Sequence, residues 1–544
     1  MSSEASPAVI AREVKRRRTF AIISHPDAGK STMTEALALH ARMISEAGAV
    51  HGKGGRRSTV SDWMEMEKAR GISVSSTALQ FNYMPTGLDG ELPPADEPYV
   101  VNLVDTPGHS DFSEDTYRVL TAVDAAVMLI DAAKGLEPQT LKLFQVCRHR
   151  GIPVITVINK WDRPGQTPLE LIDEITERIG LIPTPLYVPV GIAGDYRGLL
   201  DRRTGKYIKF ERTAGGAKVA PEEIYDADRA AQLEGDAWTA AVEESELLGE
   251  MGQDHDQEMF LAGQTSPMIF TSAMLNFGVR QLLETLVEFA PCPEGREGVD
   301  GTMREVTDPF SAVVFKVQAG MDSSHRDRLA YMRIVSGEFE RGMVVTHAQT
   351  GKPFATKYAQ AVFGRDRSTV DTAYPGDVVG LVNAMALAPG DTLYIDPKVQ
   401  FPPIPSFAPE HFSALRVTTA DKYKQFRKAI DQLDAEGVVQ VLRNDLRGDA
   451  SPVLAAVGPM QFEVVTARMK TEFNVDTLIE PLGYTLARRT DEASADELGR
   501  QRGVEVFTRS DGAILALFSD KWRLQFIEKE FASLTLEPLV AAAD

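Results

Sequence analysis

Residues 20–32 read Phe20-Ala21-Ile22-Ile23-Ser24-His25-Pro26-Asp27-Ala28-Gly29-Lys30-Ser31-Thr32, and they carry the strongest local signal for the fold of the first half of the chain. The apolar run Phe20–Ile23 predicts a buried strand, and the apolar residues Met33, Leu37 and Ala41 follow at helical spacing. A turn between a strand and a helix gathers backbone N–H groups at a helix N-terminus, which forms an anion site. We therefore expect a phosphate-binding loop here.

The candidate residues of this loop are Ser24, His25, Pro26, Asp27, Ala28, Gly29, Lys30, Ser31 and Thr32. Lys30 would reach the β- and γ-phosphates of a nucleotide, and the Ser31 hydroxyl would bind Mg²⁺. Ser24 stands where the usual pattern has its first glycine, so it must tolerate whatever backbone angle the turn requires. The alternative is a chance Gly-Lys-Ser in an ordinary loop.

Further apolar runs alternate with helical patterns up to about residue 270. They are Val100–Val104, Ala125–Ile130, Val154–Ile158 and Met268–Phe270. Such near-continuous apolar runs are typical of parallel strands that are covered on both faces. The alternation predicts an α/β domain with a doubly wound, mostly parallel sheet.

A second motif, Asp105-Thr106-Pro107-Gly108-His109, follows the run Val100–Val104. An aspartate at a strand end is where a phosphate-loop enzyme holds Mg²⁺. Gly108 can donate its N–H to a γ-phosphate, because it has no Cβ to block close approach. His109 would then lie beside the attacking water and is the candidate catalytic residue, although a histidine in a loop can also be purely structural.

A third motif, Asn159-Lys160-Trp161-Asp162, follows Val154–Ile158. The carboxylate of Asp162 can accept hydrogen bonds from both N1–H and the exocyclic amine of guanine, a donor pair that adenine lacks. The Lys160 stem can cover the base, and Ser272-Ala273, after the last run, can add a backbone contact. The order of the three motifs predicts a guanine nucleotide site with GTP or GDP and Mg²⁺ as its ligands.

The segment Arg70-Gly71-Ile72-Ser73 lies between the first two motifs. A hydroxyl at Ser73 could close over the γ-phosphate and Mg²⁺ and be released after hydrolysis. The expected metal ligands are therefore Ser31, Ser73 and Asp105. The alternative is that Arg70–Ser73 forms a plain turn.

The remaining sequence predicts two further domains. Proline-rich linkers occur near residues 290–295 and 401–409, and short period-two runs with regular turns lie between them, which predicts a small β-barrel. Beyond the second linker the pattern is α+β. We expect a GTP-binding domain over residues 1–292 with an acidic insertion at about 186–265, a β-barrel domain over 293–404 and a C-terminal α+β domain over 405–544.

Composition is that of a globular protein, with 43% hydrophobic and 25% charged residues among 544. The net charge of −20 is concentrated in residues 221–260, which hold 13 acidic residues and one arginine. This region is either a solvated acidic subdomain or a docking surface for a basic partner protein. Two distant cysteines, the lack of a long apolar segment and the lack of a secretory leader favour a cytoplasmic protein.

The chain resembles the peptide chain release factor 3 family of bacterial translational GTPases. The resemblance rests on Ser24–Ser31, Ser61–Glu67, Arg70–Ser73, Asp105–Tyr117, His325–Arg328, Ala373–Asp377 and Gly458–Val475. Ser24 and Ser73 are usual in that family, whereas Trp161 and the loop Pro85–Pro98 are local variations.

The resemblance implies a ribosome-dependent GTPase that promotes the departure of class I release factors after peptide release. It implies binding to ribosomal RNA and proteins and to class I factors, with neither a membrane nor DNA as a partner, and we expect a monomer. Two alternatives remain open: another ribosomal GTPase of the elongation factor G type, and a guanine-nucleotide-binding scaffold without turnover.

Overall fold

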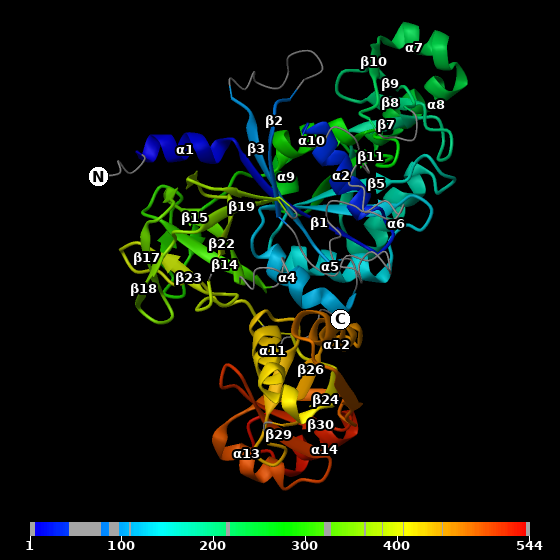
Figure 1. The fold of residues 1–544 in the computed structure, drawn as a ribbon. Coiled ribbons are helices and arrows are strands. Elements are labelled where there is room, and N and C mark those ends of the chain that lie inside the picture. Colours follow the sequence, from blue (N-terminus) through cyan, green and yellow to red (C-terminus); the bar gives the residue numbers. More distant parts are fainter. Residues whose placement is uncertain are drawn as a thin grey trace.

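The computed structural model describes residues 6–42, 78–85, 97–107, 110–213, 218–319, 328–363, 366–382, 384–405, 407–448 and 450–539. Figure 1 shows a large N-terminal domain, a β-rich domain beside it and a C-terminal domain that projects below both. None of the helices in the described ranges combines the length and the apolarity that are needed to cross a membrane.

The N-terminal domain is built on a sheet with the order β2-β3-β1-β4-β5-β11-β6. The strands that the structure describes are β1 (Arg17–Ser24), β2 (Ala78–Tyr83), β3 (Tyr99–Asp105), β4 (Ala125–Asp131), β5 (Val154–Asn159), β6 (Ile182–Pro185) and β11 (Thr265–Phe270). Neighbouring strands are parallel except for β2, which pairs antiparallel with β3. The predicted doubly wound, mostly parallel sheet is confirmed.

Helices cover this sheet and complete its core. They are α2 (Lys30–His40), α4 (Ser113–Leu120), α5 (Pro138–His149), α6 (Pro168–Ile179) and α10 (Val279–Phe289), with the short 3₁₀ helix η1 (Ser110–Phe112) before α4. Helix α1 (Pro7–Lys15) precedes β1 and contributes no residue to this core. Residues of β1, β4 and β5 are buried along their whole length. This double coverage explains why those strands have continuous apolar sequences.

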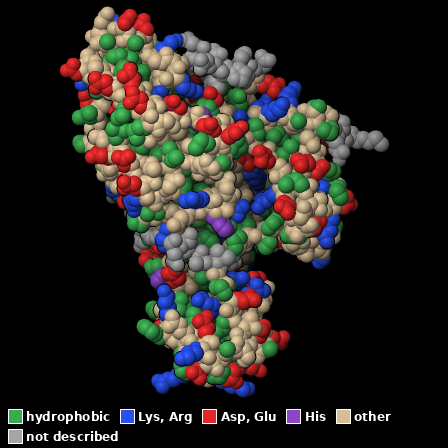
Figure 2. All heavy atoms as spheres, turned by 180° about the vertical axis from the view of Figure 1, so that it is seen from behind, with side chains coloured by type: hydrophobic (Ala, Val, Ile, Leu, Met, Phe, Trp, Pro, Cys, Tyr) green, Lys and Arg blue, Asp and Glu red, His purple; other side chains and the backbone are tan. Residues whose placement is uncertain are grey.

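The predicted insertion is a compact unit between β6 and β11. It contains a sheet with the order β10-β9-β8-β7 and three helices: β7 (Tyr187–Val190), β8 (Gly198–Asp201), β9 (Tyr207–Phe210), β10 (Glu222–Tyr225), α7 (Ala227–Glu234), α8 (Asp236–Glu250) and α9 (Gln257–Leu261). Trp238 and Leu248 of α8 are buried, so the acidic region contains a packed helix. Figure 2 shows acidic side chains spread over this unit at the upper left.

The β-rich domain follows a short hairpin, β12 (Arg296–Glu297) and β13 (Met303–Arg304). Its main sheet has the order β18-β17-β23-β14-β15-β22-β19-β20. The strands are β14 (Ser311–Ala319), β15 (Arg328–Ser336), β17 (Val344–His347), β18 (Lys352–Ala355), β19 (Ala359–Phe363), β20 (Asp366–Thr369), β22 (Val378–Val382) and β23 (Thr392–Tyr394), with β16 (Phe339–Glu340) and β21 (Thr372–Ala373) paired beside them. The alternating inner residues enclose one apolar core, which confirms the predicted β-barrel class.

The C-terminal domain has the predicted α+β composition. Its strands follow the order β27-β24-β26-β25-β29-β30-β28-β31. The elements are β24 (His411–Val417), β25 (Gln440–Arg443), β26 (Val453–Ala456), β27 (Thr477–Pro481), β28 (Leu486–Thr490), β29 (Val504–Arg509), β30 (Ile514–Phe518), β31 (Glu537–Pro538), η3 (Ala420–Lys422), α11 (Tyr423–Ala435), α12 (Met460–Phe473), α13 (Glu492–Gly499) and α14 (Lys521–Glu530).

A loop of the β-rich domain contacts the N-terminal domain. The Asp377 carboxylate lies 3.0 Å from Nε of Arg17 and accepts a hydrogen bond of 2.9 Å from Gln80. Thr19 Oγ1 donates to the Gly376 carbonyl at 2.8 Å. A Cβ at Gly376 would lie 2.4 Å from Pro293, and its φ of +94° also favours glycine. The Pro-Gly-Asp turn is therefore an interdomain contact as well as a turn.

Candidate functional site

The carboxyl ends of neighbouring parallel strands bring the three sequence motifs to one edge of the sheet. The phosphate loop follows β1, Asp105 ends β3, and Asn159 ends β5. Ser272 and Ala273 follow β11, the next strand along. Ligands of open α/β sheets bind at this edge, where connections leave to opposite faces.

The backbone of the phosphate loop is shaped for an anion. Gly29 is the N-cap of α2 with φ +97°, and glycine has no side chain to cap the helix. A helix N-terminus at this turn is a site that favours an anion. A Cβ at Gly29 would lie 2.5 Å from Nδ2 of Asn159, so only glycine fits without displacement. The left-handed residues of the loop are Asp27 and Gly29. Ser24 is the buried last residue of β1, and the turn requires no unusual backbone angle of it.

Lys30 and Asp105 face each other at the mouth of this loop. Lys30 Nζ lies 2.8 Å from Asp105 Oδ1 and also donates to the Thr106 carbonyl, and the two side chains are 6% and 0% exposed. Such a buried cation and carboxylate fit a magnesium–phosphate ligand, because the cation matches the phosphates and the carboxylate matches the metal. Ser31, the other described candidate for the metal, directly follows Lys30 in α2.

Asn159 ties three loops of the site together. Its amide Nδ2 donates to the Ala28 carbonyl at 2.8 Å, and its Oδ1 accepts from the Ala273 N–H at 3.0 Å and from Thr271 Oγ1 at 3.2 Å. Asn159 is 2% exposed, so these bonds are shielded from water. The phosphate loop is thus fixed against the loop after β11.

Lys160 and Asp162 are each held by a partner that sets their direction. Lys160 Nζ lies 2.7 Å from Oδ2 of Asp131. Burial raises the pKa of Asp131, but hydrogen bonds from Lys160 and from the Ala133 N–H outweigh it and hold the pKa below its usual range. Ser272 Oγ donates to Asp162 Oδ1 at 2.6 Å, which orients the carboxylate proposed to bind guanine.

Trp161, between these two residues, points away from the site. Its side chain is 1% exposed and packs edge-to-face on Phe270, with ring centroids 4.7 Å apart. Its backbone N–H donates to the Thr271 carbonyl at 3.1 Å, a second contact between the loops that follow β5 and β11. Trp161 therefore supports the site from behind.

Replacing Asp162 by asparagine is expected to weaken GTP and GDP binding by roughly 10- to 100-fold, because a hydrogen-bonded charge is lost. The Asn amide can donate to a 2-oxo group, so the affinity for xanthine nucleotides should rise relative to that for guanine nucleotides. Calorimetric titration with GDP and XDP measures both. As a matched control, Ser272→Ala removes the 2.6 Å bond but keeps the carboxylate, and it should retain guanine selectivity. Unchanged GDP affinity in the asparagine variant would contradict the assignment.

Three candidate residues, Ser73, Gly108 and His109, lie outside the described residues. The described chain resumes at Ser110, and the segment that follows, η1 and α4, contacts the other domains. Met460 N–H, at the start of α12, donates to Oδ2 of Asp111 at 2.7 Å. The N-cap of α12 is Pro459, which makes no side-chain cap, so Asp111 caps this helix from another domain.

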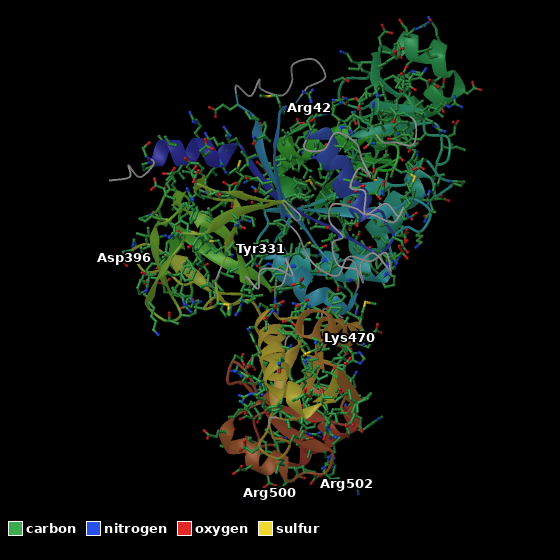
Figure 3. The ribbon with its side chains drawn as sticks, viewed as in Figure 1. Arg42, Tyr331, Asp396, Lys470, Arg500 and Arg502 are labelled. Atoms are coloured by element: carbon green, nitrogen blue, oxygen red, sulfur yellow. The ribbon has the colours of Figure 1, made fainter. Side chains whose placement is uncertain are left out.

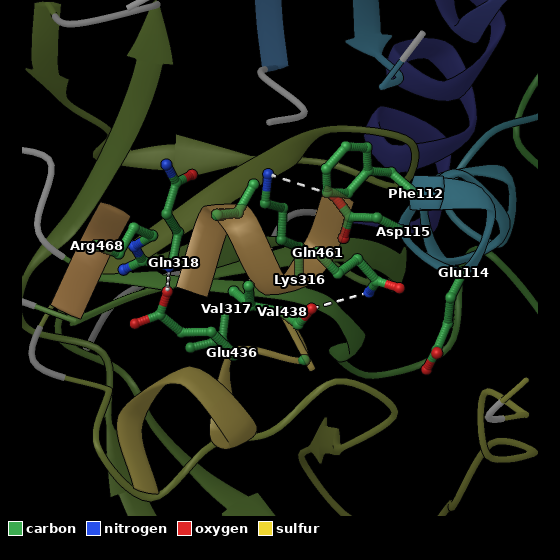
Figure 4. Close-up of a pocket in the computed structure, with 12 residues that line it drawn as sticks. Phe112, Glu114, Asp115, Lys316, Val317, Gln318, Glu436, Val438, Gln461 and Arg468 are labelled. Carbon is green, nitrogen blue, oxygen red and sulfur yellow. Dashed lines mark hydrogen bonds and ion pairs between the residues drawn. The ribbon is translucent and has the colours of Figure 1, made fainter. Parts of the chain in front are cut away.

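The junction of the three domains is closely packed around η1 and α4. Figure 4 shows side chains of all three domains around a cavity of about 60 Å³. Phe112 packs on Val464 of α12. The Arg118 guanidinium donates to the Gly437 carbonyl at 3.3 Å, and a Cβ at Gly437 would lie 2.0 Å from Arg118 Nη1. A displacement of η1 would therefore change its contacts with the C-terminal domain.

Replacing Asp111 by alanine is expected to lower the unfolding free energy of the C-terminal domain by roughly 0.5–2 kcal/mol, the range for a lost helix cap. Denaturant unfolding followed by circular dichroism measures it. Asp111→Asn keeps a hydrogen-bond acceptor, so it should lower the unfolding free energy by less than Asp111→Ala does.

A Cβ at Gly458 would lie 2.1 Å from Asp111 Cγ. Gly458→Ala should therefore be destabilising in the wild-type chain and less so beside Asp111→Ala. Additive effects of the two substitutions would show that Asp111 does not make this contact.

Three supporting residues were not among the sequence candidates: Asp131, Thr271 and Asp111. Asp131 ends β4, at the same sheet edge as the motifs, so its position after an apolar run was a usable indication. Thr271 immediately precedes the candidate Ser272. The role of Asp111 depends on a helix almost 350 residues further on, and local sequence carries no trace of it.

Three family models match successive parts of the chain. Residues 15–292 match the Elongation factor Tu GTP binding domain, residues 309–396 match Elongation factor G domain 2, and residues 401–528 match the Class II release factor RF3, C-terminal domain. A crystal structure of a Thermus thermophilus protein shares the fold, with a TM-score of 0.66 and 21% identity over 91% of this chain and 71% of that chain.

Curated relatives match over nearly the full length. Peptide chain release factor 3 of Microcystis aeruginosa is 44% identical, covering 98% of this chain and 96% of the relative. The protein of that name from Gloeothece citriformis is 45% identical, covering 96% and 95%. The chain therefore belongs to the peptide chain release factor 3 family and is a translational GTPase of translation termination.

Proposed function

We propose that the chain is a ribosome-stimulated GTPase that drives class I release factors off the ribosome after peptide release and so allows their recycling. The observation that carries the proposal is the attachment of η1 to the C-terminal domain. Asp111 lies six residues after Asp105 of the phosphate site and caps α12. A change at the γ-phosphate thus has a short physical route to the domain that is typical of this family.

In this proposal each motif has a separate task. The N–H groups of the phosphate loop and Lys30 bind the phosphates, while Asp162 and Lys160 select and cover the guanine. Ser31, Ser73 and Asp105 would hold Mg²⁺, which offsets the phosphate charge when bound. Gly108 and Ser73 would sense the γ-phosphate, and His109 would orient the attacking water.

The same proposal includes the domain division at residues 292/293 and 404/405, a cytoplasmic monomer, and the ribosome and class I factors as partners. The acidic unit remains either a solvated surface or a docking surface, and the charges in Figure 2 suit both.

The deciding experiment measures steady-state GTP hydrolysis by the full chain with and without ribosomes. In parallel, it follows the departure of a fluorescently labelled class I factor from post-release ribosomes. We expect hydrolysis to be slow alone and strongly stimulated by ribosomes, because slow intrinsic turnover is typical of such switches. Stimulated hydrolysis without factor departure would favour an elongation-type GTPase, and nucleotide binding without turnover would favour a scaffold. Either result would overturn the proposal.

A further inference from the structure

A second polar cavity lies at the opposite edge of the main sheet from the nucleotide site. It encloses about 270 Å³ and is lined by the segments that precede β4 and β5, by the hairpin strand β12 and by β15. The lining residues include Asp124, directly before β4, and Ile152, two residues before β5. The cavity thus lies between the GTP-binding and β-rich domains, and none of the described phosphate-loop or guanine-loop residues lines it.

Three arginines from different elements meet in this cavity: Arg150 from the end of α5, Arg296 from β12 and Arg333 from β15. The acidic residues that face them are Asp124 and the exposed Glu294. Oδ1 of Asp124 lies 2.5 Å from Nη2 of Arg333, so the negative charge of Asp124 is paired with the Arg333 guanidinium. Burial raises the pKa of Asp124, and the contact with Arg333 works against that rise.

The other two arginines have only neutral partners among the described residues. Arg150 donates to the Tyr117 hydroxyl at 3.2 Å and lies over its ring. Arg296 makes a weak bond of 3.4 Å to the Thr121 carbonyl and lies over the ring of Phe401. Aromatic faces and carbonyls hold the guanidinium planes in place but do not neutralise their charge.

The electrostatic consequence is visible at Arg296. Burial and then repulsion from Arg150 and Arg333 lower the pKa of Arg296 to about 10. The side chain is still a cation at neutral pH, so the cavity gathers positive charge in a partly desolvated place. An oxyanion would relieve this repulsion, and guanidinium groups bind phosphate oxygens through paired hydrogen bonds.

We propose that this cavity is a second anion site, which binds a phosphate group between Arg150 and Arg296 with Arg333 as its wall. The phosphate comes either from a free phosphorylated small molecule or from an RNA backbone. The bound group adds contacts between the GTP-binding domain and the β-rich domain, so it stabilises their relative position.

The first test maps arginine reactivity in the full, GDP-loaded chain, in which the nucleotide occupies the phosphate loop. Phenylglyoxal modification is read by peptide mass spectrometry with and without pyrophosphate. We expect pyrophosphate to reduce modification of Arg150 and Arg296 severalfold and to leave Arg502 unchanged. Figure 3 shows Arg502 at the tip of the C-terminal domain, and Arg502 does not line the cavity. Equal modification of Arg150 and Arg296 with and without pyrophosphate would overturn the proposal.

The second test uses variants and a binding measurement. Arg296→Gln should weaken calorimetric pyrophosphate binding by about tenfold or more, the effect of one lost charged hydrogen bond, while GDP affinity stays unchanged. Arg502→Gln is the matched control and should bind as the wild type does. If a short single-stranded RNA displaces pyrophosphate, the source is RNA; if it does not, the source is a small molecule. Undiminished binding in Arg296→Gln would refute the site, and the mapping on the wild-type chain decides the matter if that variant does not fold.

Discussion

Lys30→Ala should lose GTP binding by roughly two to three orders of magnitude, because one partner of a buried charge contact is removed. Lys30 is the cation of the phosphate loop, and its amino group lies 2.8 Å from the buried carboxylate of Asp105. Alanine therefore removes the charge that offsets the phosphates and leaves Asp105 without this partner. Equilibrium binding of a fluorescent GTP analogue measures the loss.

The same substitution should also lower the stability of the nucleotide-free protein. Breaking a buried ion pair on one side costs about 3–5 kcal/mol. Thermal unfolding of the variant therefore separates lost binding from lost structure. Lys134→Ala is the matched control, since Lys134 is 45% exposed and lies 3.8 Å from Glu137 near the same edge of the sheet. Wild-type GTP affinity in Lys30→Ala would show that residues 24–32 are not a phosphate loop.

The meeting of the three motifs at one edge of the sheet could be predicted from sequence, because the motifs are short and each directly follows an apolar strand. Parallel strands place their carboxyl ends at one edge, so recognising β1, β3 and β5 was enough to bring Lys30, Asp105 and Asn159 together. Ser24 needs no unusual backbone angle, since the left-handed positions of the loop are Asp27 and Gly29.

Two strands of the main sheet were not predicted, and both lie at its edges. The sequence of β6 is Ile182-Pro183-Thr184-Pro185, and two prolines in four residues argue against a central strand but are tolerated at an edge. Strand β2 runs antiparallel to β3 and belongs to no strand–helix unit. The position of β2 depends on its pairing with β3, and a short stretch of sequence around β2 does not include that partner.

Contacts between domains were beyond sequence reasoning for a related cause. The carboxylates of Asp111 and Asp377 contact residues that lie hundreds of positions away in the sequence. The three arginines of the cavity come from different elements. The family resemblance includes the segment Ala373–Asp377, but the sequence could not show that Asp377 contacts Arg17. Motif order predicts chemistry within one domain, whereas coupling between domains requires coordinates.

His109→Ala is expected to reduce ribosome-stimulated GTP hydrolysis by roughly 10²- to 10⁴-fold, the range for a positioned proton-transfer or water-orienting group. The expectation rests on sequence, because His109 lies outside the described residues, four positions after Asp105 and two before Asp111. GTP binding should persist, since the phosphate, magnesium and guanine contacts are proposed for residues other than His109. Single-turnover hydrolysis on ribosomes and equilibrium GTP binding measure the two effects separately.

The same variant separates switching from turnover. If γ-phosphate binding alone moves η1 and, through Asp111, the C-terminal domain, then His109→Ala should displace a class I factor once and recycle slowly. His149→Ala is the matched control, because His149 is an exposed histidine at the end of α5 and should leave both activities unchanged. Single-round factor departure is measured beside steady-state hydrolysis. Equal loss of both in His109→Ala would mean that the histidine also shapes the GTP-bound conformation, because departure would then need more than the γ-phosphate contacts proposed for Gly108 and Ser73.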